Sequence, residues 1–259
     1  MTGFALPRPS VRFVPIYRRN LLVWRKLALP SVMANVAEPL ITLIAFGYGL
    51  GRLLPEIGGV PYITFLVGGA LCMSTAMSAS FESLYSAFSR MHVQRTWDAL
   101  LNAPLELDDV VAAECAWAAT KGLLAGAAIA IVALAIGAVR EPMLLLALPV
   151  VALTGFVFAA IGLCFNALAR SYEFFAYYFT LVLTPMIFLS GVYYPMTVLP
   201  DWLAAPARWL PMSAAVELAR PLVLGRWPEA PLRALLLLGA YALVGYYLAL
   251  VLTRRRFSN

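Results

Sequence analysis

The chain has 259 residues, of which 63% are hydrophobic and 12% are charged, and its mean hydropathy is +0.84. Soluble domains are only about 45–50% apolar, so this composition excludes an ordinary soluble protein and indicates a polytopic membrane protein. At about 20 apolar residues per crossing, the length holds about six helices and leaves no room for a large soluble domain. The formal net charge of +6 does not indicate nucleic-acid binding, because the arginines flank apolar segments as the positive-inside rule expects.

Residues 1–30 are predicted to be a cytoplasmic N-terminus that contains an amphipathic helix in the membrane interface. Apolar and basic residues alternate between positions 10 and 29, which is typical of a helix that turns its basic groups toward lipid phosphates. The alternative is a solvated basic tail, which would expose a tryptophan and several aliphatic side chains. The alternating residues are Ile16, Leu21, Leu22 and Trp24 with Arg18, Arg19, Arg25 and Lys26.

Residues 31–259 are predicted to form one transmembrane domain with six helical spans. The inner segments carry twelve lysines and arginines and the outer segments carry six, so both termini are expected in the cytoplasm. Two connections are long, residues 89–110 inside and residues 193–230 outside. The expected spans are 31–54, 62–88, 111–138, 142–168, 173–192 and 231–253.

The outer connection contains two apolar stretches that are each too short to cross about 30 Å of hydrocarbon. The fifth span is expected to break at Gly191, and the two stretches are separated around Pro211. Backbone that leaves a helix at membrane depth must be satisfied within protein or water. We therefore expect short re-entrant helices between residues 193 and 222 that dip into the outer leaflet.

The inner loop, residues 89–110, carries a short amphipathic stretch. If residues 96–102 are helical, Trp97, Leu100 and Leu101 share one face. A short helix that presents an aromatic side chain to the cytoplasm suits docking into a groove on another protein. The alternative is an ordinary capped loop. Negative charge near a helix N-terminus is favourable, and the acidic residues that could cap the third span are Glu106, Asp108 and Asp109.

Several motifs of catalysis and cofactor binding are absent from the sequence. It contains no GxxxxGK[ST] motif for binding ATP through a P-loop. Its single histidine excludes a multi-histidine metal site, and the three cysteines lie in or beside apolar segments without CxxC spacing. No serine, histidine and aspartate set indicates a hydrolase. The chain is therefore predicted to be non-catalytic, without a metal or cofactor of its own.

Two segments resemble type-2 ABC transporter permeases. The inner loop is similar to their coupling segment, an arginine followed by Gly-Thr or a near equivalent, an acidic residue, a leucine pair and Thr-Pro-Leu, with Trp97 and Ala103 as departures. Residues 181–221 resemble the signature segment, although Ala214 stands where a polar residue is usual. The stretches RTWDALLNAPL and LSGVYYPMTVLP most resemble the nodulation-factor, or lipo-oligosaccharide, exporter group. The resemblance implies these ATPase-coupling residues: Arg95, Thr96, Trp97, Asp98, Leu100, Leu101 and Pro104.

This resemblance implies an all-α export half-transporter with six transmembrane helices, an interfacial helix and a cytoplasmic coupling helix. Two copies would pair across their first and fifth spans, and a separate P-loop ATPase, which carries ATP and Mg, would dock beneath each coupling helix. The implied function is export of a lipo-oligosaccharide or similar amphiphile across the bacterial inner (plasma) membrane. The alternatives are a drug, haem or teichoic-acid exporter of the same family, or a membrane assembly protein without transport activity.

Aromatic residues at both ends of the fifth span are candidates for the substrate pathway and exit gate. Their faces can stack on sugar rings, although an aromatic belt at each membrane surface explains them equally well. The candidates are Phe175, Tyr178, Tyr193 and Tyr194.

Three ionisable residues, Glu38, Glu82 and Lys121, fall within the expected spans. Each would cost about 2.5–3.5 kcal/mol if it faced lipid at mid-membrane, so each is expected to face protein, water or an interface. Structural pairing is favoured over substrate contact. Glu38 is the candidate partner of Lys121.

Overall fold

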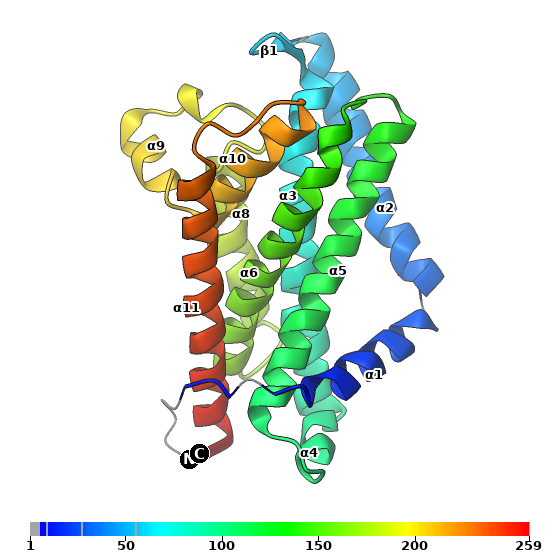
Figure 1. Cartoon of the computed structure of the whole chain (residues 1–259), viewed down its shortest axis with the longest axis vertical. Helices are drawn as coiled ribbons and strands as arrows, with labels where there is room; N and C mark the ends of the chain where they lie inside the picture. The colour runs from blue at the N-terminus through cyan, green and yellow to red at the C-terminus, as the bar shows by residue number, and fades with distance from the viewer. Residues whose placement is uncertain (1–5, 9, 27, 55, 259) are drawn as a thin grey trace.

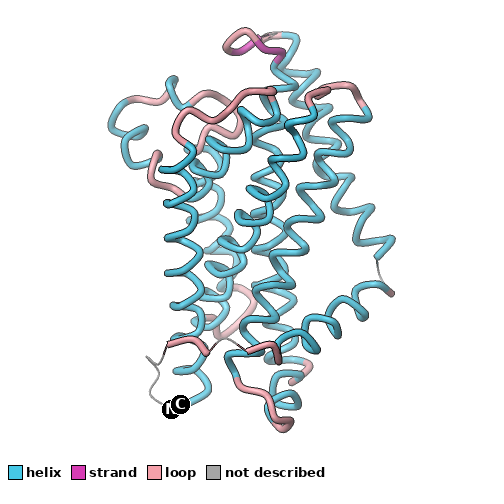
Figure 2. The backbone as a smooth tube through the Cα atoms, in the orientation of Figure 1, coloured by secondary structure: helices cyan, strands magenta, loops and turns pink. Residues whose placement is uncertain are grey.

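The computed structural model describes residues 6–8, 10–26, 28–54 and 56–258, without the side chains of residues 31, 32, 34–36, 38 and 39. Long helices run side by side along the long axis, and most loops lie at the two ends (Figure 1, Figure 2). The helices are α1 (Phe13–Arg25), α2 (Ala28–Ile44), α3 (Tyr62–Phe81), α4 (Thr96–Leu101), α5 (Leu107–Ala135), α6 (Ala147–Leu168), α7 (Phe174–Tyr177), α8 (Thr184–Leu189), α9 (Asp201–Ala207), α10 (Pro211–Val223) and α11 (Pro231–Ser258).

Tighter or wider helical turns extend several of these helices. Backbone hydrogen bonds are kept through them, as an apolar environment requires. The two short strands pair as an antiparallel hairpin. The turns are η1 (Ala45–Gly49), η2 (Leu50–Arg52), η3 (Glu82–Ser86), η4 (Ser89–Val93), η5 (Pro142–Leu146), η6 (Tyr178–Leu183) and η7 (Met196–Val198), and the strands are β1 (Glu56–Ile57) and β2 (Val60–Pro61).

Among the described residues, four helices have the length and hydropathy of a membrane span. They correspond to the second, third, fourth and sixth expected spans. The first and fifth expected spans contain the shorter apolar helices Leu40–Arg52 and Phe174–Leu189, so their crossing of the membrane remains a prediction. The four long helices are Tyr62–Val93, Leu107–Ala135, Pro142–Leu168 and Pro231–Ser258.

The core of the bundle lies where α3, α5 and α6 pack against one another, with α11 against α6. Many of its buried residues are alanine, glycine or valine, and small side chains let helix backbones approach closely in a membrane protein. Two of its buried hydroxyls are satisfied within their own helices. Thr75 donates to Leu71 O at 2.7 Å, and Thr154 donates to Val150 O at 2.8 Å.

The chain turns after α8 at Gly191, whose φ of 74° favours glycine. The Arg220 side chain on α10 holds this turn, because its Nη2 donates to Gly191 O at 2.6 Å and to Val192 O at 3.1 Å. A Cβ on Gly69 of α3 would lie 2.8 Å from the Cα of Val192, so α3 and the turn are in close contact. The two expected short helices are present as α9 and α10, and their depth in the membrane remains a prediction.

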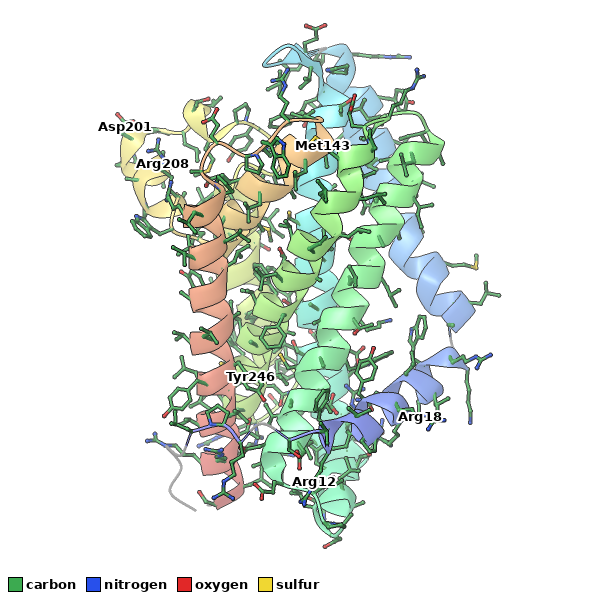
Figure 3. All side chains as sticks on the ribbon, viewed as in Figure 1. Arg12, Arg18, Met143, Asp201, Arg208 and Tyr246 are labelled. Carbon is green, nitrogen blue, oxygen red and sulfur yellow. The ribbon has the colours of Figure 1, made fainter. Side chains whose placement is uncertain are left out.

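Helix α1 lies at the same end of the molecule as α4 and the last residues of α11 (Figure 1). Arg12 and Arg18 mark this end in Figure 3, and Asp201 and Arg208 mark the opposite end. Helix α1 packs along α5 and buries Ile16 and Asn20. The basic, amphipathic segment expected between residues 10 and 29 is therefore helical from Phe13 to Arg25, and one face of this helix packs against the bundle.

Candidate coupling surface

Helix α4 begins at a strained residue. Arg95 has φ 50° and ψ 31°, a left-handed conformation that costs a residue with a side chain about 1–2 kcal/mol. Of the expected coupling residues, Arg95, Asp98 and Pro104 are exposed, and Thr96, Leu100 and Leu101 are half-buried.

Trp97 contradicts the expectation of an aromatic side chain presented to the cytoplasm. It is 1% exposed, its Nε1 donates to Glu114 Oε1 at 3.3 Å, and its ring stacks on Phe257 at 6.0 Å. The apolar face of this short helix packs on its own subunit, where it removes apolar surface from water. Trp97 therefore fixes α4 in place, and the polar residues Arg95 and Asp98 stay exposed.

A buried ion network lies directly behind Trp97. Arg90 Nε donates to both carboxylate oxygens of Glu114, at 2.9 and 3.1 Å, and Arg90 Nη2 contacts Glu114 Oε2 at 2.5 Å and Glu82 Oε1 at 2.9 Å. Trp117 Nε1 also donates to Glu82, at 2.9 Å. Burial of two carboxylates around one guanidinium is tolerated because each is hydrogen-bonded several times. The network joins α5 and the turns that follow α3 to α4.

The acidic residues before the third expected span have two structural roles, a helix cap and an ion pair. Glu106 and Asp109 form a reciprocal capping box at the start of α5, as expected for a helix N-terminus. Asp108 instead pairs with Arg254 of α11, with Nε to Oδ1 at 2.8 Å and Nη2 to Oδ2 at 2.5 Å, and both side chains are buried. The cap confirms the local expectation, and the ion pair ties the last helix to α5.

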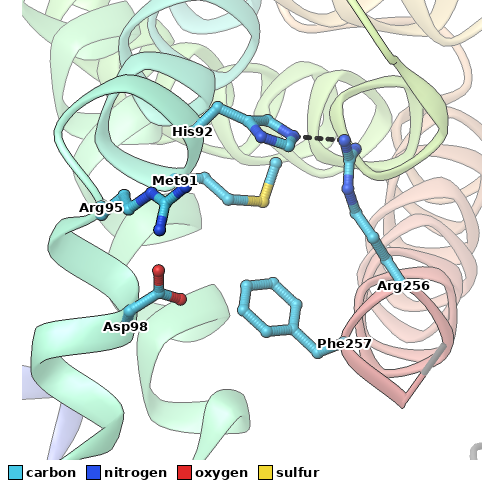
Figure 4. Close-up of a pocket in the computed structure, with 6 residues that line it drawn as sticks. All are labelled: Met91, His92, Arg95, Asp98, Arg256 and Phe257. Carbon is cyan, nitrogen blue, oxygen red and sulfur yellow. Dashed lines mark hydrogen bonds between the residues drawn. The ribbon is translucent and has the colours of Figure 1, made fainter.

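A hollow of about 250 Å³ lies between the coupling segment and the end of α11 (Figure 4). Its polar wall includes Arg95 and Asp98, and His92 contacts the Arg256 guanidinium across it. A cationic group and a carboxylate at one opening can recognise a polar partner of either sign. The residues that line it are Met91, His92, Arg95, Asp98, Arg256 and Phe257.

The expected substrate-pathway residues do not lie together on an open surface. Phe175 and Tyr178 are fully buried; Phe175 packs among aromatic rings, and the Tyr178 hydroxyl is 2.8 Å from Ser80 Oγ. Both side chains fill the core of the subunit in this conformation, and their contact with substrate stays a prediction. Tyr193 and Tyr194 are half-buried at the opposite end.

The ionisable residues of the expected spans have different surroundings. Glu82 belongs to the ion network, and Lys121 Nζ lies 5.2 Å from the centre of the Trp24 ring. The side chain of Glu38, the candidate partner of Lys121, lies outside the described residues. Glu114 was not among the predicted site residues, although a carboxylate within an apolar span is a signal of a buried partner. Among the described residues, no cluster of three or more His, Cys, Asp or Glu side chains could hold a metal ion.

Comparison with known proteins decides the family. The model of the ABC-2 type transporter family matches residues 13–224. The chain belongs to this family. The permease is 45% identical over 252 residues to Nodulation protein J of Rhizobium leguminosarum bv. trifolii, covering 97% of this chain and 96% of the relative. It is 43% identical over 256 residues to Nodulation protein J of Rhizobium meliloti (strain 1021), with the same coverage.

A more distant relative is named for transport. The inner membrane transport permease YadH of Escherichia coli (strain K12) is 26% identical over 184 residues, covering 71% of this chain and 70% of the relative. The permease is thus a multi-pass membrane protein of a transporter family, and its similarity to the nodulation proteins covers nearly its whole length.

Proposed function

We propose that this permease is the membrane subunit of an ATP-driven exporter that moves a lipo-oligosaccharide, an amphiphile with a glycan head and an acyl tail, across the bacterial inner membrane. The observation that carries this proposal is the near full-length similarity to Nodulation protein J. That similarity also makes a drug, haem or teichoic-acid cargo the weaker candidate. The twelve basic residues near the inner segments support a cytoplasmic location for both termini and for α4.

The ATPase would be a separate chain, because this sequence has no P-loop motif. We assign its docking site to the exposed side of α4 and to the hollow beside it, which includes Arg95 and Asp98. The buried side of α4 is held by Trp97 and Glu114, so a force on α4 reaches α5 through defined contacts. ATP and Mg would be bound by the ATPase, and two copies of the permease would pair through the first and fifth segments.

Docking is tested by a charge reversal with a matched control. Asp98→Lys lies in the proposed surface, and Asp201→Lys changes an aspartate that is also exposed, at the opposite end of the molecule. We expect Asp98→Lys to reduce co-purification of the ATPase at least tenfold and Asp201→Lys to leave it unchanged. Equal retention of the ATPase by both variants would place docking elsewhere.

Substrate class is tested by export from reconstituted vesicles that contain both subunits. We expect ATP-dependent movement of a labelled lipo-oligosaccharide and none of a labelled phospholipid. Tyr193→Ala and Tyr194→Ala are expected to slow export without loss of ATPase binding, because aromatic rings stack on sugars. Unchanged export by these variants would contradict the role of Tyr193 and Tyr194 as an exit gate, but would not contradict the proposed substrate class.

A further inference from the structure

A second cavity, of about 200 Å³, lies between α1 and the inner ends of the bundle helices. It is separate from the hollow beside α4. Helix α1 contributes one wall, and the other walls come from η3, η4 and α5. The residues that matter for its chemistry are Arg19, Asn20, Trp24, Glu82, Arg90 and Trp117.

Asn20 lines this cavity and carries an unused hydrogen-bond donor. The residue is 4% exposed, and its Nδ2 has no hydrogen-bond partner. The oxygen of the same amide group is engaged, because Arg19 Nη1 donates to Asn20 Oδ1 at 3.3 Å. This contact sets the orientation of the Asn20 amide. A buried amide N–H without an acceptor is destabilising, so the site is incomplete without an acceptor oxygen.

Arg19 provides a charge that the described residues do not neutralise directly. Its hydrogen bonds go to the neutral side chains of Asn20 and Thr96, at 3.3 and 3.5 Å, and no ion pair of Arg19 is present among the described residues. Burial lowers the pKa of Arg19, and the nearby positive charge of Arg90 lowers it further, against the opposing effect of Glu114. An anion beside this guanidinium would offset both the loss of hydration and the repulsion from Arg90.

The carboxylates near the cavity are already engaged. Glu82 accepts hydrogen bonds from Arg90 and Trp117, and Glu114 is bound by Arg90 and Trp97. Neither carboxylate is hydrogen-bonded to Arg19 or to Asn20 Nδ2. The positive charge of Lys121 also lies close by, 5.2 Å from the centre of the Trp24 ring. The groups that lack an anionic or acceptor partner, the Arg19 guanidinium and Asn20 Nδ2, are therefore hydrogen-bond donors. An occupant that supplies acceptor oxygens and negative charge fits them.

We propose that this cavity binds a phosphate group at the inner membrane surface, either the headgroup of an anionic lipid or free phosphate. A phosphate accepts paired hydrogen bonds from an arginine and further ones from an amide. Trp24 and Trp117, in edge contact at 6.0 Å, are the residue type that lies at headgroup depth. Arg19 also reaches Thr96, so the occupant lies one side chain away from the coupling segment.

The experiment measures phosphate-dependent stabilisation of the purified, delipidated full-length permease. Phosphatidylglycerol, phosphatidylcholine and inorganic phosphate are added separately, and the thermal midpoint and the retained lipid, by native mass spectrometry, are recorded. Arg19→Gln and Asn20→Leu are expected to weaken binding about tenfold. Arg18→Gln is the matched control, since Arg18 is an exposed neighbour that does not line the cavity.

The arms separate the two sources of phosphate. Stabilisation by phosphatidylglycerol but not by inorganic phosphate assigns the site to lipid, and stabilisation by both assigns it to the phosphate group alone. Asn20→Leu removes an unpaired donor, and Arg19→Gln provides an independent variant if the leucine disturbs packing. An equal response of the wild type, Arg18→Gln and Arg19→Gln, or no response to any of the three compounds, would overturn the proposal.

Discussion

Replacing Arg90 with methionine is expected to lower the free energy of unfolding by about 3–5 kcal/mol, because it leaves two buried carboxylates without their counter-charge. The side chains of Glu82 and Glu114 are 11% and 1% exposed, and that of Arg90 is 13% exposed. These side chains are therefore largely shielded from bulk water. At about 1.4 kcal/mol per factor of ten, the loss corresponds to more than two powers of ten in the folding equilibrium.

The assay is unfolding by titration with SDS in mixed micelles, followed by tryptophan fluorescence. The variant Arg90→Met with Glu82→Gln and Glu114→Gln removes all three charges and is expected to recover most of the loss, since an uncharged set lacks the desolvation penalty. Arg95→Gln, an exposed arginine five residues on, is the control and is expected to stay within about 0.5 kcal/mol of the wild type. If Arg90→Met also stayed within that range, the network would contribute nothing to stability and the reasoning would be refuted.

Three further changes test other contacts. Arg95→Gly is expected to raise the free energy of unfolding by up to about 1 kcal/mol in the same titration, because glycine adopts φ 50° without strain, and a decrease would contradict this. Tyr178→Phe is expected to lower it by about 1 kcal/mol through loss of the Ser80 hydrogen bond; recovery in the double variant with Ser80→Ala checks the cause. Gly69→Ala is expected to lower the thermal midpoint through a loss of about 1–3 kcal/mol, because its Cβ would clash with the turn after α8. Gly239→Ala, whose Cβ would meet nothing within 4 Å, is expected to leave it unchanged.

Local patterns predicted the local features of this chain. The alternation of basic and apolar residues predicted the helix that became α1, the acidic residues before the third span predicted its cap, and Gly191 predicted the end of the fifth segment. Each depends on neighbours within a few residues, where spacing and composition determine the conformation.

Features that depend on distant residues could not be predicted in the same way. The amphipathic face of α4 was identified, but the pattern is the same whether Trp97 faces a partner or its own subunit. Its inward direction is set by Glu114 on the next helix and by Phe257 near the end of the chain. Likewise, Asp108 and Arg254 are separated by 146 positions, and no sequence pattern predicts that they form an ion pair. Glu114 was detectable by the argument applied to Glu82, as an acid within an apolar span.

The charged contacts at the N-terminal end of α5 hold that end of the helix, so that the helix can act as a lever. Glu114 accepts hydrogen bonds from Arg90 and Trp97, and Asp108 pairs with Arg254, so η4, α4 and α11 all hold α5 within its first eight residues. The helix has 29 residues and is therefore roughly 43 Å long. A tilt of about 5° about that held end would carry the far end by about 4 Å over this length. A small displacement of α4 would thus be amplified, through the stiffness of one helix, at the opposite end of the molecule.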